Sequence, residues 1–133
     1  MKFIVGKLKK NLKQKIIIKI NDEDVWNLDY TMALILLPMF KRLKKIKNGA
    51  SGILDDDVPD DLKSTSVKEP PEHDVDENYF KRYDWVLSEI IWALKETQPN
   101  RKCKMGGADY IQHDARLNNA FRLMGTYWRT FWD

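Results

Sequence analysis

The segment Met32–Phe40 contains only apolar residues. It is far shorter than the roughly 20 residues that a membrane-spanning helix needs, so other parts of a folded protein must cover its side chains. Apolar residues on every side of a helix are typical of a helix inside a domain, and we expect a central helix here. The chain has 133 residues, 43% of them hydrophobic, which is enough for one domain with its own core.

The central helix is predicted to run from Leu28 to Lys47. Asn27 is a suitable N-cap, and Asn48-Gly49 is a typical helix end. Pro38 lies inside this helix, where it removes one backbone hydrogen-bond donor and crowds the preceding turn. We therefore expect a kink or a brief break at Pro38.

The net charge of +3 conceals three blocks of different sign. Residues 1–47 carry twelve basic and four acidic side chains (+8), residues 48–78 carry two and ten (−8), and residues 79–133 carry nine and six (+3). The acidic block contains three prolines and few apolar residues, which predicts a long exposed loop. Its aspartates lack the spacing of a calcium-binding loop, so we favour ion pairing with the basic first block over metal binding.

The first 21 residues hold seven lysines and no acidic residue. Clustered lysines can bind nucleic-acid phosphates, but no aromatic residues alternate with them as stacking on bases would require. A basic strand pair or a solvated tail is therefore favoured over a nucleic-acid arm. The β-branched run Ile16–Ile20 and the segment Phe3–Val5 predict two short strands, joined through residues 6–11.

Two further helices are expected after the acidic block. The first covers Tyr79–Glu96, with Asp74 or Asp76 near its start and a proline after its end. The second is amphipathic, opens with a capping box formed by Asp109 and Gln112, and contains Gly125 as a point of close helix approach.

The predicted fold class is mainly α (α+β): a three-helix core with a kinked central helix, a small N-terminal strand pair and a long acidic loop. We divide this single domain into residues 1–21 (basic strand pair or tail), 22–48 (first helix), 49–77 (acidic loop), 78–97 (second helix), 98–108 (linker) and 109–132 (third helix).

Enzymatic activity is the less favoured interpretation because no catalytic motif is complete. A general-base histidine needs a partner, and the sequence places none beside His73 or His113. Cys103 is the single cysteine, which excludes a disulfide framework and fits a reducing compartment. We predict no catalytic residue, no metal ligand and no cofactor. A metal-dependent enzyme would need the fold to gather scattered acidic residues. These are Asp84, Glu89, Asp109 and Asp114.

Aromatic and guanidinium side chains recur together along the predicted helices. Flat rings can stack on a base while arginine donors hold phosphate or carboxylate, so these residues suit a small, anionic, nucleotide-like ligand. We favour a purely structural role over ligand binding. In this interpretation Arg82 pairs with Glu89, and the tryptophans fill gaps between helices at the solvent-exposed edge of the core. The candidate ligand-binding residues are Trp26, Tyr30, Arg82, Trp85, Glu89, Trp92, Arg116, Asn119 and Arg122.

Several segments also carry a family resemblance. They are Val25–Thr31, Leu37–Met39 with the basic run after it, Asp56–Pro59 with Ser64-Thr65, Arg82–Leu87 leading to Glu89–Ala93, and Arg116–Asp133. In this order they resemble an uncharacterised small-protein family of large tailed phages, especially myoviruses. The resemblance implies a phage origin and expression in the bacterial host cytoplasm, without an established activity. Relatives often carry a longer insertion where this chain has only Lys95–Ala108, and the first twenty residues lie outside the resemblance.

By analogy with small phage proteins that lack catalytic motifs, we expect a non-enzymatic binding protein that acts on the host. The leading hypothesis is an anti-defence protein that sequesters a nucleotide-derived immune signal between the second and third predicted helices. The alternative is a protein–protein inhibitor of a host factor, or a virion or assembly protein, that uses the acidic loop or the aromatic C-terminus. A metal-dependent nucleotide or DNA enzyme comes third. We expect no membrane partner, and the aromatic pairs Tyr127-Trp128 and Phe131-Trp132 are available to a partner or to a second copy of the chain.

Overall fold

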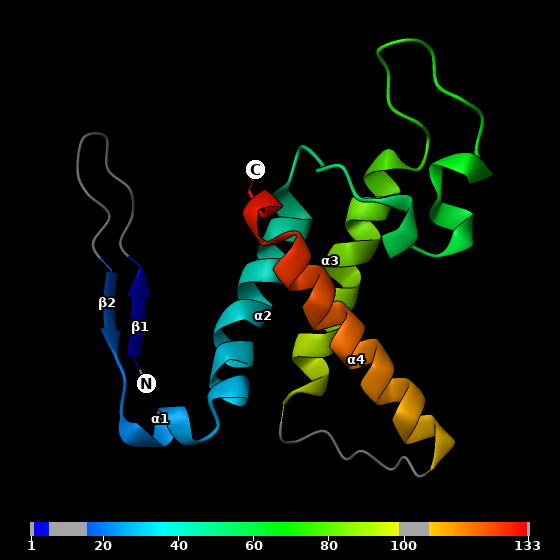
Figure 1. Cartoon of the computed structure of the whole chain (residues 1–133). Coiled ribbons are helices and arrows are strands. Elements are labelled where there is room, and N and C mark those ends of the chain that lie inside the picture. The colour runs from blue at the N-terminus through cyan, green and yellow to red at the C-terminus, as the bar shows by residue number, and fades with distance from the viewer. Residues whose placement is uncertain (1, 6–15, 99–106, 133) are drawn as a thin grey trace, which may run out of the picture.

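The computed structural model describes residues 2–5, 16–98 and 107–132. It is mainly helical, as predicted, and three long helices form its core (Figure 1). These helices are α2 (Leu28–Ile46), α3 (Tyr79–Glu96) and α4 (Ala108–Thr126). No helix of the described residues is long and apolar enough to cross a membrane.

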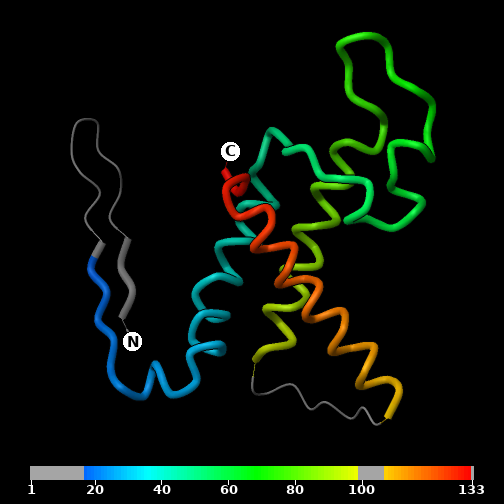
Figure 2. Tube along the Cα trace, in the orientation of Figure 1, coloured from blue at the N-terminus to red at the C-terminus, as the bar shows by residue number. Residues whose placement is uncertain are grey.

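An antiparallel ribbon precedes the helices and confirms the predicted strand pair. Strands β1 (Lys2–Val5) and β2 (Ile16–Lys19) pair in a register that places Lys2 opposite Lys19. The predicted connection through residues 6–11 lies outside the described residues. Figure 2 shows β2 standing apart from the three core helices.

A short helix, α1 (Asp22–Trp26), links the ribbon to α2 and was not predicted. Its start is stabilised by the Asn21 backbone N–H, which donates a 2.9 Å hydrogen bond to the Asp24 carboxylate. The hydroxyl group of Thr31 donates a 2.7 Å hydrogen bond to the Asp24 carbonyl group and joins α1 to the first turn of α2. The acidic residues that start α1 also suit the positive end of the helix dipole.

The helix at the centre of the fold is α3. The sequence analysis predicts the helix that corresponds to α2 for this place, and that prediction is wrong. Half of α3 is buried, and α2 and α4 each pack along it. By contrast, α2 buries only Ala33, Leu37 and Phe40. Met32 and Met39 are 44% and 54% exposed. The prediction was wrong because α2 packs against α3 on one side, and the side chains of Met32, Leu34 and Met39 are left exposed.

The helix boundaries agree with the predictions at some ends and differ at others. Helix α2 begins after Asn27 as predicted and runs through Pro38 without a break. The predicted brief break at Pro38 is therefore wrong, and the kink expected as its alternative stays a prediction. The predicted helix over Tyr79–Glu96 is confirmed as α3, but its N-cap is Asn78. Asp76 lies two residues before this N-cap, and its carboxylate accepts a 2.9 Å hydrogen bond from the Asn78 backbone N–H besides those from the Arg82 guanidinium.

The last helix differs from its prediction at both ends. Its N-cap is Gly107, in a left-handed conformation (φ 58°), so the predicted capping box at Asp109 is wrong. The helix ends at Thr126 and is followed by a single 3₁₀ turn, η4 (Trp128–Thr130), so it does not extend to residue 132. Gly125 faces open space, because no atom of the described residues lies within 4 Å of where a Cβ would stand. It therefore mediates no close helix approach in this part of the chain.

The acidic segment, residues 49–77, is more ordered than the exposed loop that was predicted. It contains three 3₁₀ turns, η1 (Asp55–Asp57), η2 (Asp60–Leu62) and η3 (Ser64–Ser66), and it buries the side chains of Ile53 and Val58 in the core. The segment lies at the α3 side of the molecule, away from the ribbon (Figure 1). Among the described residues, Asp55, Asp57 and Asp76 face arginines of α3 and α4 and not the basic first block, so the expected pairing is wrong for this part of the chain. The lysines at positions 7–15 lie outside the described residues.

Candidate functional site

The nine candidate ligand-binding residues are distributed over separate parts of the fold. Trp26 ends α1 and is 75% exposed, and Tyr30 lies in the first turns of α2. Trp85 lies on α3, partly buried against the hydrophobic core. The other six residues form three groups at the contacts of α3 and α4 with each other and with the acidic segment, each built around one arginine.

The first group surrounds Arg82, which is only 4% exposed. Its two terminal nitrogens donate hydrogen bonds of 2.9 and 2.8 Å to the two carboxylate oxygens of Asp76. This pairing raises the pKa of Arg82 and lowers the pKa of Asp76. The Arg82–Glu89 pair expected from the sequence is wrong, because seven residues of helix separate the two by roughly 10 Å along the axis. Arg82 instead holds the acidic segment on α3.

The second group joins α3 to α4. Arg116 donates hydrogen bonds of 2.9 and 2.7 Å to the two carboxylate oxygens of Glu89, and these raise the pKa of Arg116. The Arg116 guanidinium carbon lies 3.9 Å from the centre of the Trp92 ring, a close cation–π contact. The Trp92 ring also meets the imidazole of His113 edge-on. A ring and an arginine lie together here, as the sequence predicts for a ligand site. The carboxylate that the arginine binds, however, belongs to Glu89 and not to a ligand.

The third group fastens the end of α4 to the acidic segment. Arg122 donates a 2.7 Å hydrogen bond to the Asp57 carboxylate and a 3.0 Å hydrogen bond to the Asn119 side chain. The Tyr127 hydroxyl donates a 2.5 Å hydrogen bond to the other Asp57 oxygen and accepts one of 3.1 Å from the Leu54 backbone N–H. Burial and this bond to Asp57 raise the pKa of Tyr127.

All three arginines that were expected to hold an anionic ligand therefore engage carboxylates of the chain. A nucleotide would have to displace Asp76, Glu89 or Asp57 from its partner. Ligand binding by this set stays a prediction, and each of the three arginines has a carboxylate partner within the chain.

The acidic residues considered for a metal-dependent enzyme are not gathered. Asp84 forms a 2.9 Å ion pair with Lys47, Glu89 pairs with Arg116, and Asp114 accepts a hydrogen bond from Asn118. Within residues 2–5, 16–98 and 107–132, no three histidine, cysteine, aspartate or glutamate side chains lie close enough together to hold a metal ion.

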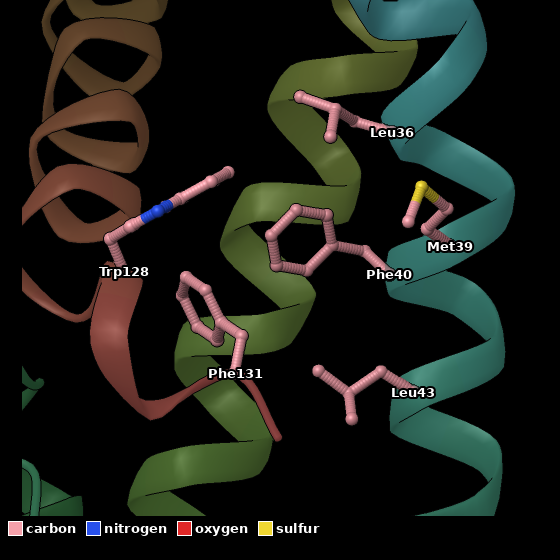
Figure 3. Close-up of a pocket in the computed structure, with 6 residues that line it drawn as sticks. All are labelled: Leu36, Met39, Phe40, Leu43, Trp128 and Phe131. Carbon is pink, nitrogen blue, oxygen red and sulfur yellow. The ribbon is translucent and has the colours of Figure 1, made fainter. Parts of the chain in front are cut away.

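A feature that the sequence analysis missed is an apolar groove between α2 and α4. The two helices pack on α3, approach each other at their C-terminal ends and diverge toward their N-terminal ends (Figure 1). At the narrow end lies a cavity of about 370 Å³, in which Phe40 of α2 and Phe131 of the C-terminal segment meet edge to face with ring centres 4.9 Å apart (Figure 3). Leu36, Met39, Leu43 and Trp128 complete its lining.

A second cavity, of about 450 Å³, continues toward the wide end, and Leu36 lines both. Leu94 of α3 contributes to this second cavity. We name the two cavities together the α2–α4 groove. Its apolar walls are Met32, Leu36, Met39, Phe40 and Leu43 on one side and Leu117, Phe121, Met124, Trp128 and Phe131 on the other.

The groove is open to solvent. Met32, Met39 and Trp128 are 44%, 54% and 56% exposed, although each has a large apolar side chain. Methionine and aromatic side chains adapt well to the shape of a partner, and contiguous apolar patches on a protein surface commonly mark binding sites. The signal that could have revealed the groove is the apolar run of α2: a helix that is apolar on every side but packs on one side leaves part of that run uncovered.

Comparisons with protein-family models, with curated proteins and with solved structures found no match to this chain. The resemblance to a family of phage proteins therefore stays a prediction.

Proposed function

We propose that this chain is a non-enzymatic phage protein that acts by binding a protein of the bacterial host, and that the α2–α4 groove is its contact surface. The observation that carries the proposal is the open groove itself. Two methionines and a tryptophan line it in half-exposed positions. Burying such side chains against a partner stabilises a complex by removing apolar surface from water.

The spacing of the groove residues indicates what kind of segment would fit. Met32, Leu36, Met39 and Leu43 follow one another at intervals of four, three and four residues along α2. Leu117, Phe121, Met124 and Trp128 repeat the same intervals along α4 and the turn after it. Matching stripes with this spacing form the seams of helical bundles, where a further helix covers them. An amphipathic helix of the partner would therefore complete a four-helix arrangement.

The basic side chains beside the groove favour one orientation of the partner helix. Exposed Lys41, Arg42 and Lys45 lie near the C-terminal end of α2, beside the narrow end of the groove. A partner helix with acidic residues at the end that meets these side chains would associate faster and with a defined orientation.

Sequestration of a nucleotide-derived immune signal, the leading hypothesis from the sequence, receives less support. It relies on arginines whose donors already engage Asp76, Glu89 and Asp57. A virion or assembly role would use the same groove with a phage protein as partner, so it differs from our proposal in the identity of the partner and not in the contact surface.

A photo-crosslinking experiment in infected bacteria tests the proposal. A photoreactive phenylalanine analogue is placed at Met39, inside the groove, and in a matched variant at Ile111, which is 70% exposed on α4 and lines neither groove cavity. We expect one host protein to be crosslinked stoichiometrically from position 39 and not from position 111. A Trp128→Asp change should abolish capture, whereas Ile111→Asp should leave it intact. Equal capture from both positions, or capture that survives Trp128→Asp, would contradict the proposal.

A further inference from the structure

The side of α2 that points away from α3 carries a second surface, separate from the groove. Ala33, Leu37 and Phe40 mark the buried side of the helix. Residues on the opposite side recur at intervals of three and four positions, which places them along one stripe of a helix. They are Leu28, Thr31, Ile35, Pro38, Arg42 and Lys45. We name this stripe, together with Leu34 and Ile46 at its margins, the outer face of α2.

The outer face is open to solvent. Leu28, Leu34 and Ile46 are 53%, 40% and 42% exposed, and Pro38 is exposed as well. Figure 1 shows α3 on one side of α2 and the ribbon standing apart on the other, and these exposed fractions show that the ribbon leaves the outer face uncovered. A helix that presents apolar side chains in this way is stabilised when a second surface removes them from water.

The N-terminal end of the outer face is acidic. Residues 16–31 carry one basic and four acidic side chains. Three of the acidic residues belong to the first turn of α1. The Thr31 hydroxyl group donates a hydrogen bond of 2.7 Å to the Asp24 carbonyl group, so α1 lies beside this end of the outer face.

The C-terminal end of the outer face is basic. Residues 41–47 carry five basic side chains and no acidic one. Lys44 and Lys47 turn toward α3, where they bind polar side chains, whereas Arg42 and Lys45 are exposed on the outer face. The outer face is therefore acidic at one end, apolar in the middle and basic at the other end.

A surface with this charge pattern is complementary to itself when it is turned end over end. We propose that the outer faces of two copies pack against each other, with their α2 helices antiparallel about a two-fold axis between Ile35 and Pro38. The acidic end of each copy then meets the basic end of the other, and the two helix dipoles are favourably opposed. A parallel arrangement would bring like charges together at both ends.

The spacing of the stripe fits this two-fold axis. From Leu28 to Lys45 its intervals are three, four, three, four and three residues, and they read the same in both directions. Arg42 of one copy therefore lies opposite Thr31 of the other. Since Thr31 is hydrogen-bonded to α1, this match places the guanidinium group beside the carboxylates of α1.

Other occupants fit the outer face less well. Nucleic acid would neutralise the basic end, but the acidic end would repel its phosphates and the apolar middle would stay in water. The inference does not rest on the proposed function, because other residues of α2 line the groove. In the dimer Arg42 and Lys45 face the second copy, so the charge preference of the groove depends on the oligomeric state and its apolar walls do not.

The first test measures the oligomeric state of the unmodified full chain. Light scattering coupled to size exclusion should show a dimer whose dissociation constant rises with salt, because opposite charges meet across the contact. Trp128→Asp changes the groove and should leave this dissociation constant as it is. A chain that is monomeric at every concentration, a dimer that salt strengthens, or a dimer that Trp128→Asp abolishes would overturn the proposal.

A charge at the two-fold axis tests the position of the contact. Pro38→Glu should raise the dissociation constant by roughly tenfold or more, because it places a carboxylate in the apolar middle of the contact. Glutamate suits a helix interior better than proline does, so α2 should persist, and circular dichroism checks this. Pro38→Ala is the matched control and should dimerise like the unmodified chain. Equal dissociation constants for the two variants would contradict the proposed position.

Charge reversal tests the pairing of the two ends. One variant combines Arg42→Glu with Lys45→Glu, and a second combines Asp22→Lys with Glu23→Lys. Each variant alone should dimerise more weakly than the unmodified chain, because like charges then meet at both ends of the contact. In an equal mixture each reversed end meets an end of opposite charge, so mixed dimers should form. If both variants dimerise as strongly as the unmodified chain, or if the mixture forms no mixed dimer, the proposal is wrong.

Discussion

The guanidinium group of Arg116 on α4 and the carboxylate of Glu89 on α3 form a two-pronged ion pair, with nitrogen–oxygen distances of 2.9 and 2.7 Å. Glu89 is 8% exposed, whereas half of the Arg116 side chain is exposed. The two residues are therefore not equivalent: loss of the arginine strands a buried carboxylate, while loss of the carboxylate leaves an arginine that can turn toward solvent.

This asymmetry predicts the effect of removing the arginine. Arg116→Met should lower the free energy of unfolding by about 1–3 kcal/mol, because the buried Glu89 carboxylate loses its partner. The double variant Glu89→Met with Arg116→Met should recover part of that loss. Urea unfolding of both variants measures the difference, and a double variant that is less stable than Arg116→Met would speak against this account.

The Arg82–Asp76 pair predicts a dependence of stability on pH. Hydrogen bonds from Arg82 hold the pKa of Asp76 below its ordinary value, so the folded state favours the ionised carboxylate. The resulting stabilisation is present above the ordinary aspartate pKa of about 4 and is lost as the pH falls through the lower folded value. In Asp76→Asn this part of the acid destabilisation should disappear. Urea unfolding at neutral and acidic pH measures it, and an unchanged slope would exclude Asp76 as a contributor.

The hydrogen bonds of the Tyr127 hydroxyl group predict a loss of stability when this group is removed from the contact between α4 and the acidic segment. Tyr127→Phe removes the hydrogen bond to Asp57 and leaves the Leu54 N–H without its acceptor, so it should cost about 1–3 kcal/mol. Tyr110→Phe is the matched control, because Tyr110 is 55% exposed and should tolerate the change. Thermal unfolding compares the two, and equal melting temperatures would show that the Tyr127 hydroxyl adds nothing.

Because only one face of α2 is buried, two leucine truncations on this helix should have different effects on stability. Leu37→Ala should cost about 2–4 kcal/mol, since its side chain is 8% exposed and a cavity would remain in the core. Leu34→Ala removes the same atoms from a side chain that is 40% exposed and should cost about 1 kcal/mol or less. The pair differs only in position on one helix. Similar losses for both would mean that α2 is covered on both sides, as the sequence analysis had expected.

Local signals along the chain determined where the secondary structure lies. The β-branched run around Ile17 predicts a strand, and the repeat of apolar residues through Tyr83 and Leu94 predicts α3, because backbone geometry sets these periods within each element. Helix α2 begins after Asn27, as the residue type at this position predicts, although the Asn27 side chain makes no capping hydrogen bond. Mainly helical architecture with one strand pair follows from such features without knowledge of any long-range contact.

The tertiary structure alone decided which side chains meet. The sequence cannot specify that Arg82 chooses Asp76 over Glu89, or that Asp57 lies between Arg122 and Tyr127, because those partners come from segments whose approach depends on the packing of whole helices. The same reason applies to α2. Its apolar run requires burial somewhere, but only the placement of α3 and α4 determines which side is covered and which side forms the open groove.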